Sequence, residues 1–309
     1  MLLRRFCVGW VTATSKFLPS VIALGAALAA CESSPGPADA DVTIGGNRPV
    51  SLFMTPDAWD GKTPLPLLLV IHGYTVGGLA QALYFNLEPL VNEKQIILVA
   101  PDGLFDNSGK RYWNAVDTCC DYDHRGEDDV AYLTGVVDEI ASRYPVDLKR
   151  VYVIGHANGG AMALRLACDA SSKFAAVFEL AGQFWSDPAT QCQPSAPIAL
   201  RVLHGTADPE VPYDGGSAGN VDSLFSPGAL TIASFFAGKN GCSTTPDTSP
   251  PPLDLEAGIA GAETTVTRYT ACQPNGDVEV WAIQGGTHIP YFQPNFNEVV
   301  WDFFAAHSR

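Results

Sequence analysis

The stretch R-V-Y-V-I-G-H-A-N-G-G, residues 150–160, combines an apolar β-branched strand with a sharp turn, and a helical run, A-M-A-L-R-L-A-C, follows it. Gly155 and Gly159 bracket the turn, where small residues suit a central residue forced into a strained backbone conformation beside a helix. This strand–turn–helix context is that of the nucleophile elbow, G-x-S-x-G, in which the strain exposes a serine hydroxyl above a sheet. Residue 157 is alanine, so this turn has no hydroxyl to expose.

Apolar runs alternate with helical patterns along the rest of the chain. Continuous apolar runs are typical of strands buried on both faces, and alternation with helices indicates parallel pairing. We expect strands at 66–72, 95–100, 151–154, 174–180, 198–204 and 278–283, and helices at 128–143, 161–168 and 298–307. This order predicts an α/β fold with a mostly parallel central sheet covered by helices on both faces. Residues 244–261, with four prolines, read as an irregular surface loop.

The N-terminal segment is expected to be an export signal, so residues 1–30 are set aside from the fold. Its basic start precedes an apolar run too short and too rich in small residues for a comfortable membrane span. The run ends in L-A-A-C, which resembles a bacterial lipobox and would make Cys31 the lipidated first residue of the mature chain. Residues 31–42 would then be a flexible tether, and residues 43–309 the folded domain. The alternative is an ordinary cleaved secretion signal with a coincidental cysteine.

Composition limits the partners of this chain. It has 309 residues, of which 47% are hydrophobic, enough to bury the core of one large domain. The formal net charge of −15 argues against nucleic acid and against electrostatic adhesion to anionic lipid. Membrane contact is therefore expected only through the lipid anchor. We expect an exported monomer, held at the outer membrane or cell surface if lipidated and secreted otherwise.

The cysteines predict disulfides rather than a metal site. Of the eight, six remain once Cys7 and Cys31 are assigned to the signal and the anchor, and an even number in an exported chain suggests disulfides. Proximity in sequence favours two bridges, Cys168–Cys192 and Cys242–Cys272. The adjacent Cys119 and Cys120 could form a strained vicinal bridge or remain thiols. No pair has the C-x-x-C and histidine spacing of a zinc site, so neither metal nor cofactor is expected.

Two polar residues downstream of the turn complete a hydrolytic pattern. V-L-H-G-T-A-D-P-E-V-P-Y places Asp208 in a turn after a buried strand, and W-A-I-Q-G-G-T-H-I-P-Y-F places His288 in a loop after the last strand. Nucleophile, acid and histidine follow this order in hydrolases with an elbow. The histidine would take the nucleophile's proton while the aspartate fixes its tautomer. Each residue alone is also consistent with an ordinary turn or loop position.

A third loop supplies the oxyanion hole in this scheme. His72-Gly73-Tyr74 follows a buried strand, and Tyr74 would donate one backbone N–H to the oxyanion. The residue after the nucleophile position, Asn158, would donate the other. The alternative is that this loop is an ordinary turn after a strand, with no role in an oxyanion hole. A literal G-x-S-x-G at 215–219 follows no apolar strand and opens no helix, so we interpret it as a flexible loop.

The motifs together resemble one branch of the α/β-hydrolases. L-V-I-H-G-Y, A-P-D-G, Y-W-N-A, C-C, D-D-V-A-Y-L, R-V-Y-V-I-G-H-x-N-G-G, H-G-T-A-D and G-G-T-H look like the polyhydroxybutyrate depolymerase and feruloyl-esterase-like branch, from about residue 43 to the end. The resemblance implies a secreted serine esterase that cleaves polyester, feruloyl or acetyl-polysaccharide esters without a cofactor. It assigns the nucleophile to position 157, the acid to Asp208 and the base to His288. The cleft aromatics would be Trp113, Trp185 and Tyr291, for which core or lid packing is the alternative.

The alanine at position 157 leaves three functional hypotheses. In the first, the chain is a serine esterase that has lost only its nucleophilic oxygen, by deliberate or recent substitution. In the second, it is a natural non-catalytic protein that binds esters or glycans at the cell surface. In the third, it is a hydrolase in which His288 activates water directly. The third is the weakest, because removing a triad member lowers kcat on the order of 10⁶-fold. A non-catalytic chain is expected to drift at Asp208 and His288, and both are retained, but the sequence alone does not separate the first hypothesis from the second.

Overall fold

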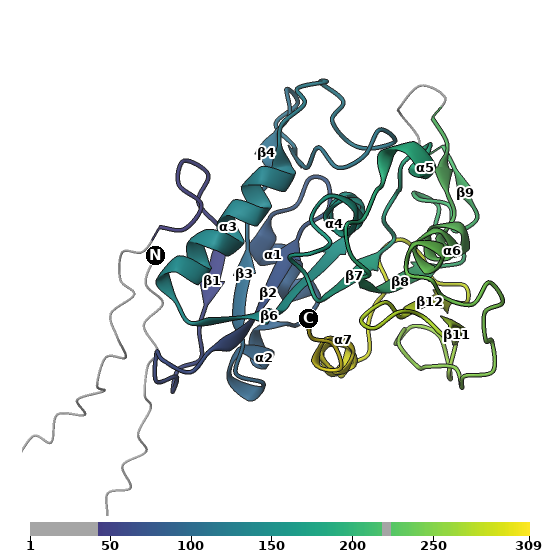
Figure 1. Cartoon of the computed structure of the whole chain (residues 1–309). Helices are drawn as coiled ribbons and strands as arrows, with labels where there is room; N and C mark the ends of the chain where they lie inside the picture. The colour runs from purple at the N-terminus through teal and green to yellow at the C-terminus, as the bar shows by residue number, and fades with distance from the viewer. Residues whose placement is uncertain (1–42, 218–223) are drawn as a thin grey trace, which may run out of the picture. The chain divides into compact units, whose positions relative to one another are not determined.

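A sheet of eight strands forms the centre of the computed structural model, which describes residues 43–217 and 224–309 (Figure 1). The expected signal peptide, the tether and Cys31 lie outside the described residues. The strand order is β1-β3-β2-β6-β7-β8-β12-β11. These strands are β1 Leu52–Met54, β2 Leu65–Ile71, β3 Ile97–Ala100, β6 Val146–His156, β7 Ala176–Leu180, β8 Ala199–Gly205, β11 Thr264–Tyr269 and β12 Val278–Ile283.

The inner strands from β3 to β12 are parallel, and the two edge strands are antiparallel to their neighbours. Every residue of β2, β7, β8 and β12 is buried, although only β2 is a continuous apolar run and each of the other three strands includes at least one charged residue. Alternate side chains of β2 enter different cores: Leu67 and Leu69 lie in one and Leu68 and Val70 in the other. The predicted mostly parallel sheet, covered on both faces, is confirmed.

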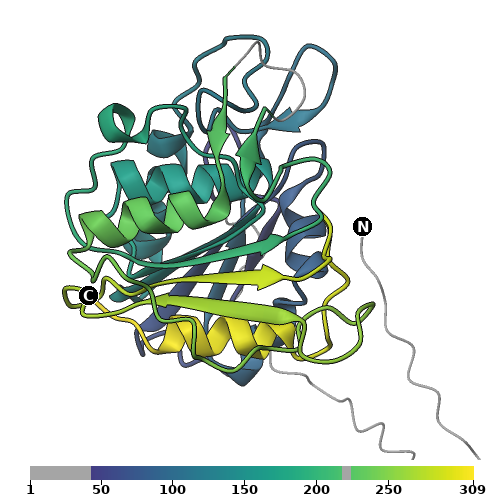
Figure 2. The same ribbon diagram turned by 90° about the vertical axis from the view of Figure 1, so that its right-hand side faces the viewer.

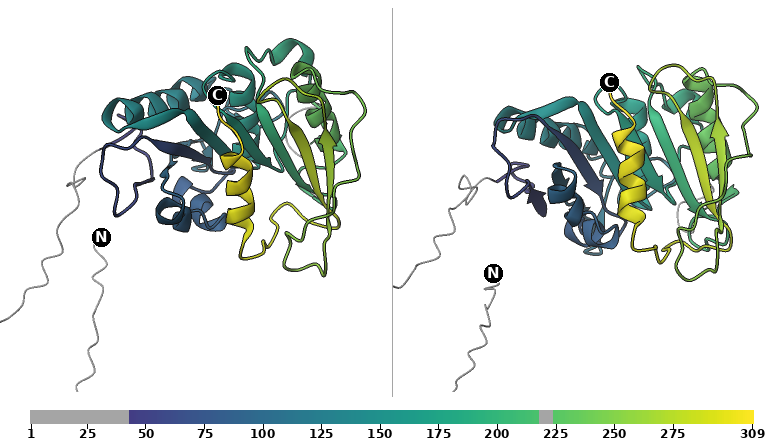
Figure 3. Two further views of the ribbon diagram at one scale, coloured as in Figure 1. Left: turned by 60° about the horizontal axis from the view of Figure 1, so that its bottom comes forward. Right: turned by 90° about the horizontal axis from the view of Figure 1, so that it is seen from below.

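Helices cover both faces of the sheet. The first core joins the sheet to α3, α4 and α6, and the second joins it to α1, α2 and α7. Figure 2 shows the sheet between the teal and green helices on one side and the yellow α7 on the other, and Figure 3 shows α7 lying across the sheet. The helices are α1 Gly78–Tyr84, α2 Glu88–Glu93, α3 Asp129–Arg143, α4 Asn158–Asp169, α5 Pro188–Gln191, α6 Ala229–Lys239 and α7 Phe296–Ala305.

The sequence patterns missed several elements. The edge strands β1 and β11, and the helices α1, α2 and α6, were not expected, because edge strands are half exposed and α6 is apolar on most of its surface. Four two-residue strands were also missed, β4 Leu104–Phe105, β5 Arg111–Tyr112, β9 Gly215–Gly216 and β10 Ser226–Pro227. The irregular loop at 244–261 pairs with the sheet through isolated bridges, such as the bridge of Leu253 to Thr264. It does not lie wholly on the surface, because Leu255 is buried in the second core.

Three glycines let the turn between β6 and α4 pack tightly against its neighbours. A Cβ on Gly155 would lie 2.1 Å from the carbonyl oxygen of Gly159, and a Cβ on Gly159 would lie 2.2 Å from that of Ile71. A Cβ on Gly160 would lie 2.9 Å from the carbonyl oxygen of Leu180 in β7. Contacts below 3 Å with backbone atoms require the backbone to shift, so these positions demand glycine for close approach.

The six cysteines within the described residues form three disulfides. Cys168 is bonded to Cys192 and Cys242 to Cys272, as their proximity in sequence predicts. Cys119 and Cys120, whose state the sequence left open, are bonded to each other. Disulfides fit a protein that folds in an oxidising compartment, so they fit an exported chain. Among the described residues no helix is long and apolar enough to cross a bilayer.

Candidate active site

Ala157 occupies the tip of the turn that the sequence singles out. Its φ of 53° and ψ of −118° place a non-glycine residue in a sparsely populated backbone region. The Ala157 N–H donates to the carbonyl oxygen of Leu180 over 2.8 Å, and the Ala157 carbonyl accepts from the N–H of Ala161 in α4. The turn thus keeps the geometry that displays a nucleophile, and it displays a methyl group.

Asp208 and His288 meet beside this turn. Nδ1 of His288 lies 2.8 Å from Oδ2 of Asp208, although the residues are 80 apart in sequence. Both are buried, at 7% and 6% exposure. Strands β8 and β12 are parallel neighbours, so the loops that follow them emerge at the same edge of the sheet. The two residues chosen from sequence are therefore hydrogen-bonded in the manner of the acid and histidine of a triad.

Asp208 also accepts hydrogen bonds from the backbone of its own turn. Its Oδ1 accepts the backbone N–H groups of Glu210 and Val211, over 2.8 and 2.9 Å. Oδ2 lies 3.3 Å from Nε2 of a second histidine, His204. Burial opposes ionisation of Asp208, yet the hydrogen bonds from His204 and His288 hold its pKa well below its usual range. Asp208 is therefore a carboxylate that accepts and does not donate.

His204 and Glu179 form a buried polar pair next to Asp208. His204 lies on β8 and Glu179 on β7, where their registers put them on the same face at diagonal positions. Burial raises the pKa of the Glu179 carboxyl to about 7, and the nearby His204 opposes that rise. Burial disfavours the charged form of His204, but the hydrogen bond to Asp208 and the field of Glu179 raise its pKa overall. Both groups bind protons more tightly in the folded protein than in the unfolded chain.

Glu179 and His204 contribute stability that is lost as the pH rises. Because their folded pKa values are both raised, this contribution fades between about pH 5 and pH 8. His72 and His156 act in the opposite sense, because burial lowers their pKa values to about 4 and they therefore favour the folded state more as the pH rises toward 6.5. The contribution of Glu179 is measured as the difference in the free energy of unfolding between the parent and Glu179→Gln in urea, which should fall by about 1–3 kcal/mol from pH 5 to pH 8. The exposed Glu93→Gln should show no such pH-dependent difference, and a Glu179→Gln difference that does not vary with pH would contradict the assignment.

The loop after β2, His72-Gly73-Tyr74, lies beside Ala157 and His288 and carries the backbone N–H of Tyr74. His72 holds this loop, because its Nε2 accepts the Gly103 N–H over 2.7 Å and its Nδ1 donates to the Gly73 carbonyl over 2.7 Å. Burial lowers the pKa of His72 to about 4, which keeps the ring neutral for these two roles. Gln81 on α1 accepts the Gly73 N–H over 3.2 Å. The loop conformation is therefore fixed by hydrogen bonds before any ligand binds.

The backbone N–H groups of Tyr74 and Asn158 have no hydrogen-bond partner among the described residues. Their side chains are engaged elsewhere. The Tyr74 hydroxyl donates to Asp106 over 2.5 Å. The side-chain amide of Asn158 forms two hydrogen bonds with the backbone of Trp113: it accepts the Trp113 N–H over 2.7 Å and donates to the Trp113 carbonyl over 3.0 Å. Two free donors beside residue 157 are what an oxyanion hole requires.

The predicted role of Trp113 as a cleft aromatic is wrong. Trp113 is fully buried, packs against the tilted ring of His72 and donates its indole N–H to the His72 carbonyl over 2.9 Å. Trp185 and Tyr291 also line neither part of the cavity described below. Arg165 lies over the Trp185 ring, and Tyr291 is 76% exposed. Apolar side chains of this size serve cores and clefts alike, so composition could not separate the two uses.

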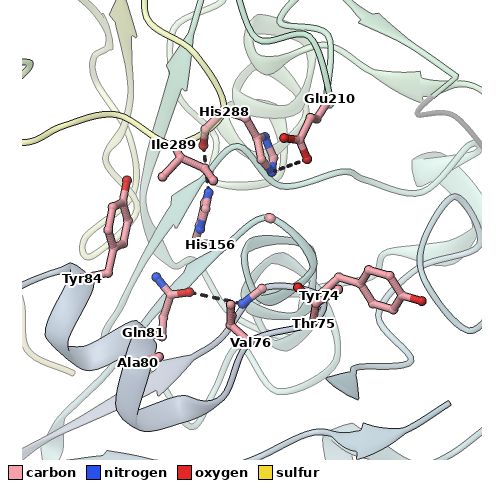
Figure 4. Close-up of a pocket in the computed structure, with 12 residues that line it drawn as sticks. Tyr74, Thr75, Val76, Ala80, Gln81, Tyr84, His156, Glu210, His288 and Ile289 are labelled. Atoms are coloured by element: carbon pink, nitrogen blue, oxygen red, sulfur yellow. Dashed lines mark hydrogen bonds and ion pairs between the residues drawn. The ribbon is translucent and has the colours of Figure 1, made fainter. Parts of the chain in front are cut away.

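A cavity with two lobes surrounds Ala157 and His288. The first lobe has a volume of about 460 Å³, and Figure 4 shows Val76, Tyr84, His156 and Ile289 among the side chains around it. The second has a volume of about 400 Å³ and includes the Cys119–Cys120 disulfide, Tyr122 and Gln183. Four residues line both lobes: Tyr74, Ala157, Glu210 and His288. Two spaces that meet at the acid–histidine pair suit the two halves of an ester.

Residues 60–220, more than half of the 309, match the family described as phospholipase/carboxylesterase. This chain belongs to that family. Solved structures agree on the fold: the acetyl xylan esterase from Aspergillus awamori has a TM-score of 0.58 at 16% identity, covering 85% of this chain and 97% of that one. A thermostable esterase has a TM-score of 0.54 at 14% identity, covering 83% and 58%. At such identities the likeness shows the α/β-hydrolase fold alone.

Three relatives show similarity in sequence. Feruloyl esterase C of Emericella nidulans is 27% identical over 303 residues, 94% of this chain and 97% of the relative. "Putative esterase NocK" of Nocardia uniformis subsp. tsuyamanensis is 34% identical over 184 residues, 59% of this chain and 51% of the relative. Feruloyl esterase D of Neurospora crassa is 27% identical over 234 residues, 72% and 66%. The chain thus spans about half of the length of the Nocardia relative and about two thirds of the Neurospora one.

Sequence reasoning missed two histidines and an acid in this phospholipase/carboxylesterase-family site. His156 precedes the turn residue, and its Nε2 lies 2.9 Å from the carbonyl oxygen of His288. Burial lowers the pKa of His156 to about 4, so the neutral ring donates to that carbonyl and fixes the histidine loop. His204 supports the acid, and Glu210 lines both lobes. All three stand inside the motifs quoted from sequence, next to the chosen residues, but adjacency did not reveal their contacts.

The described residues hold no group of three or more histidine, cysteine or acidic side chains arranged to bind a metal ion. The literal G-x-S-x-G at 215–219 begins in the short strand β9, and its Ser217 lines the second lobe instead of heading a helix. Its last two residues lie outside the described residues.

Proposed function

We propose that this chain is a carboxylic-ester hydrolase of the feruloyl esterase, acetyl xylan esterase or polyhydroxybutyrate depolymerase type whose nucleophile is replaced by Ala157. The observation that carries the proposal is the 2.8 Å bond between Asp208 and His288 at the cavity that Ala157 lines. The family match and the relatives named as feruloyl esterases support it. The natural substrate is proposed to be an ester of a polyester or of an acylated polysaccharide, without a cofactor.

The proposed chemistry is acyl transfer to a serine at position 157. In that form the serine Oγ attacks the ester carbonyl while His288 Nε2 takes its proton, and the carbonyl oxygen becomes the oxyanion held by the N–H groups of Tyr74 and Asn158. His288 then gives the proton to the departing alcohol, and water hydrolyses the acyl-enzyme with His288 as the base. Asp208 orients His288 and stabilises its charged form. Ala157 supplies no oxygen for the first step, so the chain as it stands forms no acyl-enzyme.

The intact surroundings favour a disarmed esterase over a dedicated binding protein. Supporting groups that serve only catalysis, such as the free N–H of Tyr74 and the acid–histidine bond, give a binding protein no advantage. An ester- or glycan-binding protein at the cell surface is the second candidate, because the two lobes remain open to a ligand. A water activated directly by His288 would lack the covalent step that makes each half of the reaction easier.

The Ala157→Ser variant tests the proposal through covalent chemistry. Treated with a serine-directed fluorophosphonate, it should gain one adduct at residue 157 in peptide mass spectrometry, because His288 can remove the proton of the new hydroxyl. The unaltered chain should gain none at that peptide. A folded Ala157→Ser chain that neither reacts nor turns over an ester would mean that more than one oxygen atom is missing, and the binding protein would then be the better assignment.

We also propose that the chain is exported and anchored by a lipid on Cys31. This proposal rests on the L-A-A-C motif and is supported by the disulfides of the folded domain. Expressed in a Gram-negative host, the full chain should incorporate labelled fatty acid and sediment with membranes. Cys31→Ser should abolish the label and release the protein, whereas unchanged sedimentation would contradict the anchor.

A further inference from the structure

Glu210 stands where the two lobes of the cavity meet. Its carboxylate oxygen Oε2 lies 3.8 Å from Nε2 of His288, the atom that would face the nucleophile (Figure 4). The side chain is 64% exposed, so it retains its water while it faces the cavity. Histidines apart, it is the one ionisable side chain with a formal charge among the described residues that line either lobe.

The backbone of Glu210 is held by the acid itself. The backbone N–H of Glu210 donates to Oδ1 of Asp208 over 2.8 Å, and the next residue, Val211, donates to the same oxygen. The turn that holds the acid toward His288 therefore also holds Glu210 beside it. No lysine or arginine of the described chain lines the lobes; Lys110 lies over the Tyr74 ring at 5.5 Å from its centroid.

A carboxylate at this place acts on any charge that a substrate brings into the lobes. At about 4–6 Å, partly screened by water, repulsion between two carboxylates amounts to a few-fold change in affinity. A neutral ester feels no such effect, and a cationic one is attracted. The acidic chain as a whole, at −15, adds a weaker field of the same sign that salt screens.

We propose that Glu210 selects substrates by charge, disfavouring esters that carry a carboxylate near the scissile bond and favouring neutral or cationic ones. The inference concerns the same site as the proposed function and rests on it. It narrows the substrate class: interior ester bonds of a polymer, or esters of neutral sugars, fit the site better than the acid ends of oligoesters or esters of uronic acids.

Binding to the unaltered chain tests this without turnover. Monomethyl adipate and dimethyl adipate differ by one charge at nearly equal size, and their dissociation constants can be measured by NMR titration. The neutral ester should bind more tightly, and Glu210→Gln should narrow the ratio of the two constants about three- to tenfold. Raising the salt from 0.05 to 0.5 M should narrow it in the parent and barely change it in Glu210→Gln.

Asp214→Asn is the matched control, because Asp214 is exposed, four residues away, lines neither lobe and changes the net charge equally. It should leave the ratio as in the parent. A ratio that Glu210→Gln does not change, or that Asp214→Asn changes as much, overturns the proposal; so does failure of the neutral ester to bind at millimolar concentration. In the Ala157→Ser background the ratio of kcat/KM for the two esters should shift in the same way. Absence of turnover there would contradict the proposed function while the binding ratios still decide the role of Glu210.

Discussion

Ala157→Ser should convert this chain into an esterase, with turnover of p-nitrophenyl acetate on the order of 10⁴–10⁶-fold above that of the unaltered protein. The substitution adds one oxygen to a turn whose backbone already has the required φ of 53° and ψ of −118°. The acid–histidine bond of 2.8 Å and the free N–H groups of Tyr74 and Asn158 are likewise in place. Steady-state kinetics at neutral pH, with the unaltered protein at equal concentration, measures the gain.

Two controls separate restored catalysis from a chance reactive hydroxyl. Adding His288→Ala to Ala157→Ser should return the rate to near that of the unaltered chain, because the reaction then lacks the base that Asp208 orients. His156, the other histidine of the cavity lining, already donates its Nε2 proton to the backbone carbonyl of residue 288. Ser217 already carries a hydroxyl in the second lobe, so its presence in the unaltered chain controls for hydroxyls that lack the elbow. A rate that survives His288→Ala would mean that residue 157 does not act through this histidine.

Asp208→Asn in the Ala157→Ser background should lower kcat by about 10³–10⁴-fold while the fold persists. Asparagine can keep one oxygen as the acceptor for the N–H groups of Glu210 and Val211, which preserves the turn. Its amide nitrogen then replaces Oδ2 and donates to Nδ1 of His288. The neutral ring is thereby forced to carry its proton on Nε2, where it cannot accept the proton of the serine.

Tautomer reversal and simple unfolding predict different measurements. Circular dichroism and urea unfolding should show that the Asp208→Asn protein remains folded, and KM should change far less than kcat. Histidine side-chain NMR should show the proton of the neutral His288 ring moved from Nδ1 to Nε2. An unchanged kcat in the folded variant would remove Asp208 from the proposed mechanism, and a lost fold would be visible before any kinetic assay.

Local sequence patterns predicted the central part of the fold because the inner strands are buried on both faces. Such strands appear as continuous apolar runs, as in the fully buried β2 and β3. The edge strand β11 alternates buried and exposed residues and was missed, and so was α6, whose apolar residues obscure a helical period. The elbow was recognisable because its glycines are required by contacts within and next to the turn itself.

By itself the sequence determined the strand–turn–helix around Ala157, the order of Asp208 and His288 behind it, and the pairing of the nearer cysteines. Each of these depends on short-range chemistry or on the order of motifs along the chain. Tertiary structure alone decided that His204 shares Asp208, that Trp113 belongs to the core, and that Glu210 lies between the two lobes. Those contacts arise where parallel strands bring distant loops to one edge of the sheet, and no local pattern encodes which side chains then meet.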